Sequence, residues 1–162
     1  MTPFAWLLGL VLPACGAEGI SGLPAPTLVD IARIERPSTP NTFLAGPAGM
    51  TPPPDEVIPP MHLPAEALYN EARVVFARQP RTFVAAEFPD RRQVDYVVRS
   101  RILNFPDLVT VQVNQAGPGR GALIIWSRSV YGRSDFGVNR ARANAWLADL
   151  RQSPALQQVK ER

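Results

Sequence analysis

Polar side chains are concentrated between residues 127 and 140, in the order Ser-Arg-Ser-Val-Tyr-Gly-Arg-Ser-Asp-Phe-Gly-Val-Asn-Arg. Three kinds of chemistry suit these residue types. A serine could act as a nucleophile with Asp135 as its base, or the arginines could bind an anion at a helix start near Gly137. In the third interpretation the residues form a structural network, in which Asp135 caps the helix and pairs with an arginine. Capping and ion pairing account for most of the residue types, so the network is our first hypothesis.

The catalytic interpretation lacks an activating partner for the serine. A serine hydroxyl is a weak nucleophile unless a histidine or lysine activates it, and neither residue occurs in the polar stretch. The whole chain has one histidine, His62, and one cysteine, Cys15. These two residues cannot supply the ligands of a zinc site, and one cysteine excludes an internal disulfide. We therefore expect no catalytic residues, no metal and no cofactor.

Seven residues of the stretch are candidates for binding a ligand or a partner. They are Arg128, Tyr131, Arg133, Ser134, Asp135, Asn139 and Arg140. Because side chains alternate along a strand, we expect Ser127 and Ser129 on one face of the sheet and Arg128 on the other.

Charge is unevenly distributed along the chain. Residues 1–64 contain two basic and five acidic side chains, whereas residues 65–162 contain 15 basic and nine acidic ones. A basic domain favours anionic partners such as lipid headgroups, although an ordinary solvated surface explains the same charges. We do not expect nucleic acid as a partner.

The N-terminus carries an apolar run of eleven residues, 4–14. It is shorter than the roughly 20 residues of a membrane-spanning helix and is typical of a signal-peptide core. It ends in Leu-Pro-Ala-Cys-Gly, which resembles a bacterial lipobox, in which the cysteine is acylated. The alternative is a buried cysteine on a short core helix. We predict a signal segment over residues 1–15, lipid attachment at Cys15, and a periplasmic protein that is anchored to a membrane, or secreted to the periplasm if it is not lipidated.

Residues 16–64 form a Pro-rich segment, which we call the arm. Eleven of the 18 prolines lie between residues 20 and 64, and proline excludes helix interiors and central strands. A short strand or helical turn is conceivable at Thr27–Ile34. The arm either spaces the domain from a membrane or wraps around it. Its apolar side chains favour wrapping: Ile31, Ile34, Phe43, Leu44, Met50, Val57 and Ile58.

Residues 65–153 have the pattern of an α+β domain. Apolar spacing predicts a helix from Pro64 to Ala77 and another from Asp135 or Val138 to Arg151. Between them, strand-like runs separated by Pro and Gly turns indicate an antiparallel meander of four strands. The predicted strands are Arg81–Phe88, Gln93–Leu103, Leu108–Asn114 and Ala122–Ser129. We expect both helices on one face of the sheet and a frayed tail over residues 154–162.

The polar stretch resembles the signature of the domain-of-unknown-function family numbered 1499, which occurs in bacterial envelopes and plastids. The matching positions are Ser127, Arg128, Gly132, Ser134, Asp135, Gly137, Asn139 and Arg140. Upstream, Ser-Thr-Pro-Asn at residues 38–41 resembles a second element of that family, but Thr42 stands where the family has cysteine. The resemblance implies a fold and an envelope location over about residues 36–152, and it implies no activity.

Together these observations predict an exported small protein that acts by binding, as an accessory protein of the envelope or a subunit of a membrane complex. The alternatives are a binder of small anions or lipid headgroups at the arginine-rich corner, and a small hydrolase that uses a serine of residues 127–140. The sequence predicts no oligomeric state.

Overall fold

The computed structural model describes residues 16–160, and Cys15 with the apolar run before it lies outside the described residues. In this part of the chain, no helix combines the length and the apolar character needed to cross a membrane.

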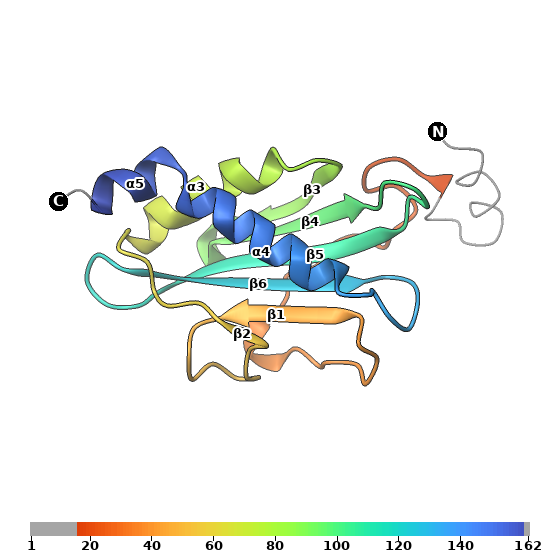
Figure 1. Ribbon diagram of the computed structural model, residues 1–162, viewed down its shortest axis with the longest axis horizontal. Coiled ribbons are helices and arrows are strands. Elements are labelled where there is room, and N and C mark those ends of the chain that lie inside the picture. Colours follow the sequence, from red (N-terminus) through yellow and green to blue (C-terminus); the bar gives the residue numbers. More distant parts are fainter. Residues whose placement is uncertain (1–15, 161–162) are drawn as a thin grey trace.

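One mixed sheet organises residues 16–160. Its strands are β1 (Thr42–Gly46), β2 (Glu56–Val57), β3 (Thr82–Phe88), β4 (Gln93–Arg99), β5 (Pro106–Gln115) and β6 (Gly121–Ser129). They lie in the order β2-β1-β6-β5-β4-β3 (Figure 1). Neighbours are antiparallel except β1 and β2, which are parallel. The α+β class is confirmed, and the predicted meander corresponds to β3–β6. The prediction of a four-stranded sheet is wrong, because the sheet has two more strands.

The two additional strands come from the Pro-rich arm. β1 pairs with β6, from Thr42 opposite Arg128 to Ala45 opposite Ile125, and β2 extends the edge beyond β1. Both strands are short and lie between prolines, so neither has a long alternating pattern of its own. The partner of β1 on β6 lies far along the chain, so no local sequence signal connects these two segments, and β2 in turn pairs with β1.

The predicted helices form on one face of the sheet. They are α3 (Ala65–Ala77) and α4 (Val138–Arg151). A third helix, α5 (Pro154–Lys160), follows directly and places Leu156 in the core. The predicted frayed tail is therefore wrong over these residues. A helix this short is unstable alone, so packing against the domain decides its formation.

The main core lies between the helices and the sheet. Valines and leucines of β4, β5 and β6 alternate toward α3 and α4. Trp146 of α4 joins the layers: its ring stacks on Phe76 of α3 with centroids 4.9 Å apart, and it meets Tyr96 of β4 edge-on at 5.5 Å. This aromatic group fixes how α4 lies across the sheet, and so fixes where the polar start of α4 falls.

The arm covers the opposite face of the sheet, which we call the back face. Ile31, on a 3-10 turn over Ile31–Arg33, packs with Leu44, Ile124 and Trp126 in a second small core. Gln93 of β4 holds the arm by accepting from the Val29 N–H at 3.0 Å and donating to the Val29 carbonyl at 2.8 Å.

The arm therefore wraps the domain. Of the apolar arm residues expected to pack, Val57 is the exception, with 55% of its side chain exposed. It lies on β2 at the edge of the sheet, where no further strand covers it.

Candidate functional site

A buried polar cluster joins the end of β6 to the start of α4. Ser127 and Asn139 are both fully buried, and the Ser127 hydroxyl donates to Asn139 Oδ1 at 2.6 Å. Asn139 Nδ2 donates to the Asn41 carbonyl at 3.0 Å and to Ser129 Oγ at 3.1 Å. The Asn139 amide thus connects α4 to β6 and to the residue before β1.

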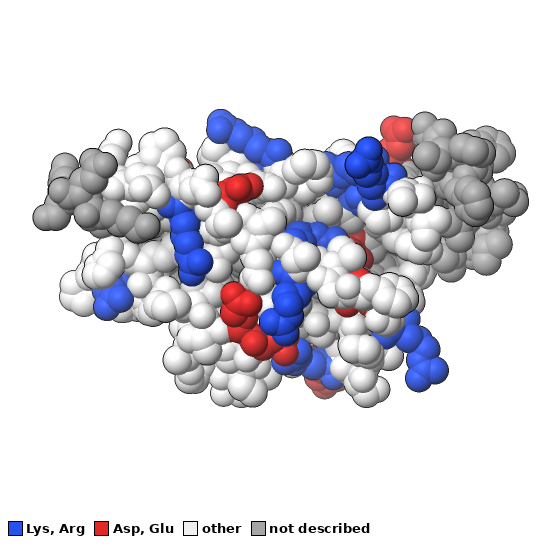
Figure 2. All heavy atoms as spheres, in the orientation of Figure 1, with Lys and Arg blue, Asp and Glu red and all other residues white. Residues whose placement is uncertain are grey.

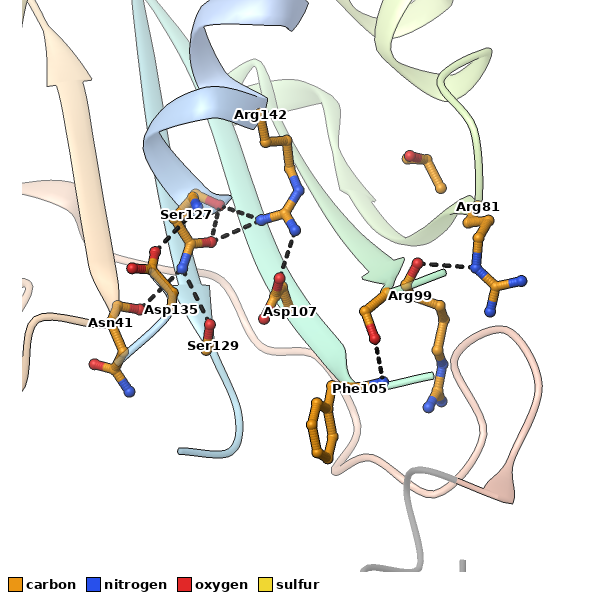
Figure 3. Close-up of polar contacts among 12 residues, drawn as sticks. Asn41, Arg81, Arg99, Phe105, Asp107, Ser127, Ser129, Asp135 and Arg142 are labelled. Carbon is orange, nitrogen blue, oxygen red and sulfur yellow. Dashed lines mark hydrogen bonds and ion pairs between the residues drawn. The ribbon is translucent and has the colours of Figure 1, made fainter. Parts of the chain in front are cut away.

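Arg142 enters the cluster from the next turn of α4. Its Nη1 donates to Asn139 Oδ1 at 2.7 Å and to Ser127 Oγ at 3.0 Å, and its Nη2 pairs with the Asp107 carboxylate on β5 (Figure 3). The Arg142 and Asp107 side chains are 9% and 8% exposed. Charge-assisted bonds of this kind are strong when both partners are withdrawn from water. The positive charge is therefore neutralised inside the cluster and is not presented to a ligand.

Asp135 organises the start of α4. Its carboxylate accepts from the Gly137 N–H at 2.9 Å and from the Asn139 N–H at 3.0 Å. Partial burial opposes its ionisation, but these N–H groups outweigh the burial and hold the pKa of the carboxyl below its ordinary value. Asp135 thus occupies the position that an external anion would need. The predicted ion pair with an arginine does not form within residues 16–160, where no salt bridge involves Asp135.

The loop before α4 is tied to the arm through Asn41. Asn41 Nδ2 donates to the Gly132 carbonyl at 2.9 Å, and the Thr39 hydroxyl donates to Asn41 Oδ1 at 2.9 Å. Positive φ angles at Gly132, Phe136 and Gly137 let the chain turn sharply between β6 and α4. The turn leaves Phe136 with 95% of its side chain exposed.

This geometry gives no support to serine chemistry. The Ser127 proton points to an amide oxygen, which is not a base, and the hydroxyl is sealed from solvent. Ser134 Oγ accepts from the Phe136 N–H at 3.3 Å, and the exposed His62 precedes α3. Within residues 16–160 no three His, Cys, Asp or Glu side chains are grouped so that they could hold a metal.

The comparison with known families bears on the same residues. The profile of the family described as Protein of unknown function (DUF1499) matches residues 34–150. The chain belongs to this family. No curated protein matches the chain. The DUF1499 match includes every member of the buried cluster and excludes both the first part of the arm, before residue 34, and α5.

The structure does not bring the seven candidate residues together at one site. Asp135 and Asn139 belong to the buried cluster, whereas Arg128 lies on the back face among the arm contacts. The ring of the half-buried Tyr131 is 6.4 Å from that of Phe105. Arg140 lies over the Phe43 ring at 4.6 Å.

Two further predicted residues, Ser134 and Arg133, are exposed on the loop before α4. Arg133 makes no hydrogen bond or ion pair with any described residue. Of the seven candidates, it is therefore the arginine most available to a partner.

Five members of the cluster were not among the seven candidates: Ser127 and Ser129, which lie within the polar stretch, and Asn41, Asp107 and Arg142, which lie outside it. The position of Arg142 three residues after Asn139 is the available signal, because side chains at that spacing share a helix face. Asp107 falls in what reads as a turn, and only the pairing of β5 with β6 places it opposite Ser129. Asn41 was named only within a resembling element, and its contact with Asn139 depends on strand β1.

Proposed function

We propose that this DUF1499 protein is an exported, lipid-anchored accessory protein of the bacterial envelope that acts by binding, with one end of the domain turned toward the membrane surface. The observation that carries the proposal is the composition of that end. We define the loop end as residues 16–20, 100–105 and 130–138.

Contacts hold the three segments of the loop end together. Asn104 Nδ2 donates to the Ala17 carbonyl at 2.9 Å, which brings the first described residues beside the loop between β4 and β5. The Val130 N–H donates to the Pro106 carbonyl at 3.2 Å, which joins the loop after β6 to the start of β5. In Figure 1 all three lie at the same end of the sheet, and Gly16, the first described residue, belongs to this end. A lipid on Cys15 would therefore attach at this end.

The loop end has the residue types that bind a lipid surface. Phe136 is 95% exposed, Ile102 69% and Val138 48%. Arg101 and Arg133 are exposed beside them, and neither forms a hydrogen bond or ion pair with a described residue. Glu18 is an exposed acid at this end. Exposed apolar side chains with neighbouring arginines bind anionic bilayers by combining burial with charge attraction.

The basic side chains elsewhere are scattered, with acidic ones between them, on the face shown in Figure 2. At the arginine-rich corner, Arg140 lies 3.8 Å from Glu56, and Asp135 accepts from the N–H groups at the start of α4. Arg133 is exposed there and has no ion pair with a described residue. Because Asp135 already occupies the helix start, the geometry argues against the alternative of a small-anion site there. Burial of Ser127 argues against this serine as the nucleophile in the hydrolase alternative.

Vesicle binding tests the proposal. A chain that begins at Gly16 lacks the apolar run and the acylation site, so its binding reports the domain alone. We expect it to sediment with phosphatidylglycerol vesicles, and we expect Phe136→Ser and Ile102→Ser to reduce the bound fraction several-fold. Val57→Ser is the control, because Val57 is also an exposed apolar residue but lies on β2 at the sheet edge.

Equal vesicle binding by the two loop-end variants and the control would reject the membrane-facing orientation. Co-purification from detergent-solubilised membranes tests the accessory role separately. A stable membrane-protein partner whose capture is lost in Phe136→Ser would place the loop end against that protein instead of lipid.

A further inference from the structure

A second set of polar residues, separate from the cluster at α4, lies on the back face of the sheet beneath the arm. Asp95 of β4 is directly opposite Thr110 of β5, and Arg128 follows on β6, where it is opposite Leu108. Polar side chains on a covered sheet face need hydrogen-bond partners, because they have lost water. Their neighbour Gln93 shows the usual outcome, since it bonds to Val29 and to Gln112 Oε1 at 3.0 Å.

Asp95, in contrast, lacks a hydrogen-bond partner within the described chain for one of its carboxylate oxygens. It is 8% exposed, and its Oδ1 has no hydrogen-bond partner among the described residues. Burial raises the pKa of Asp95, and the neighbouring Thr110 hydroxyl and Arg128 guanidinium offset this only in part. A buried carboxyl oxygen without a donor is rare in folded proteins and calls for an explanation.

Arg128 likewise uses few of its hydrogen-bond donors within the described part of the protein. Its hydrogen bond within the described chain is from Nη1 to Thr110 Oγ1, at 3.3 Å. A guanidinium has five N–H donors, arranged as a fork that matches a carboxylate. Burial lowers the pKa of Arg128, and the charge of Asp95 acts in the opposite direction.

Both side chains line a cavity of about 330 Å³ between the arm and the sheet. The rest of its lining is mainly apolar: Leu23 and Pro24 come from the arm, and Val97 and Leu108 come from the sheet. The volume is within the range of small-molecule sites, and an apolar cavity with a few convergent polar groups is their usual composition.

We propose that this cavity binds a small zwitterion with an apolar body, of the class of apolar α-amino acids. Its ammonium group donates to Asp95 Oδ1, its carboxylate accepts from the Arg128 guanidinium, and its side chain lies against the apolar walls. A purely cationic ligand would be repelled by Arg128 and a purely anionic one by Asp95. A molecule with both charges satisfies both residues. This inference does not depend on where the protein is located or on whether its loop end meets a membrane.

Calorimetric titration of the full-length protein with L-leucine tests the proposal. We expect saturable one-to-one binding, and at least tenfold weaker binding of leucinamide, which lacks the carboxylate, and of N-acetylleucine, which lacks the ammonium. Absence of leucine binding would overturn the proposal, as would a leucinamide or N-acetylleucine affinity equal to that of leucine.

Variants locate the binding. Asp95→Asn is expected to weaken leucine binding at least tenfold, and unchanged affinity would overturn the assignment. Because a substitution on the sheet can impair folding, Leu23→Trp provides a second route. It fills the cavity from the arm and should abolish binding with little change in the melting temperature of the unliganded protein. Leu28→Trp is its control, because Leu28 is 44% exposed and lies outside the cavity lining. Leucine binding that survives Leu23→Trp would exclude this cavity.

Discussion

Arg142 and Asp107 form a nearly buried ion pair between α4 and β5, and the same guanidinium donates to Ser127 and Asn139. The pair is the charged centre of the polar cluster. It explains why a stretch so rich in functional residue types can serve mainly to hold the sheet and helix together. Each polar atom that the cluster buries is used within the protein.

Removing one partner of this pair is expected to be costly. In Asp107→Asn or Arg142→Gln the remaining charge stays buried without its counter-ion, and the free energy of unfolding should fall by about 3–5 kcal/mol. Urea denaturation followed by circular dichroism measures the change. Arg140→Gln is the matched control on the same helix, because its pair with Glu56 is exposed and should contribute about 1 kcal/mol or less. Equal losses in Arg142→Gln and Arg140→Gln would contradict a special role for the buried pair.

Asp135 is expected to stabilise the protein in a pH-dependent way. Its pKa is lowered from the ordinary value of 3.8 by the start of α4. A lowered pKa in the folded state means that the stabilisation is complete above the unfolded pKa and is lost as the pH falls through the folded one. At neutral pH, Asp135→Ala should lower stability by about 0.5–2 kcal/mol, as loss of a cap does.

The difference in melting temperature between the wild type and Asp135→Ala should therefore be constant from pH 8 to about pH 5 and shrink below about pH 4. Differential scanning calorimetry from pH 8 to below pH 4 measures this difference. Asp90→Ala, an exposed acid on the turn after β3, is the control. A difference that grows on acidification would contradict the assignment of the cap to the ionised carboxylate.

The arm is expected to contribute directly to the stability of the domain. Ile31 is 6% exposed and Leu44 is fully buried against the back face, so Ile31→Ala and Leu44→Ala should each cost about 2–5 kcal/mol. Leu28→Ala, on the exposed side of the arm, should be within about 0.5 kcal/mol of the wild type. Chemical denaturation measures the free energy of unfolding of each of the three variants. A stability unchanged in Ile31→Ala would show that the arm detaches in solution.

Lipid attachment at Cys15 is tested in cells. We expect mass spectrometry of the native protein to find a chain that begins at an acylated Cys15, and we expect Cys15→Ala to shift the protein to the soluble periplasmic fraction or to leave it unprocessed. Recovery of an intact N-terminus that begins at Met1 would reject the lipoprotein proposal. Thr2→Ala serves as the control for substitution near the N-terminus.

Much of the framework was predictable from the sequence, because its signals are local. Helix α3 follows from apolar spacing that Pro64 and Pro80 delimit, and β3–β6 follow from alternating residues between Pro and Gly turns. The alternation along β6 also predicted Ser127 and Ser129 on one face of the sheet and Arg128 on the other. The structure confirms this and shows that the serines face the helices and Arg128 the arm.

The composition of the candidate site was not predictable in the same way. Asn41, Asp107 and Arg142 come from three distant parts of the chain, and only Arg142, three residues after Asn139, has a local signal. They become partners only when β1 joins β6 and α4 crosses the sheet end, since hydrogen bonds between distant segments depend on strand register and helix placement.

By itself, the amino-acid sequence determined the α+β class, the positions of α3, α4 and the meander, the family resemblance, and which residues of β6 share a face. Only the tertiary structure decided that the arm adds two strands and covers the back face, that the polar stretch closes on itself around Arg142, and that Asp95 and Arg128 share a cavity. Periodicity and turn residues act within a few positions of the chain. Burial, ion pairing and cavity formation depend on which distant segments meet, and that is settled by the packing of the whole domain.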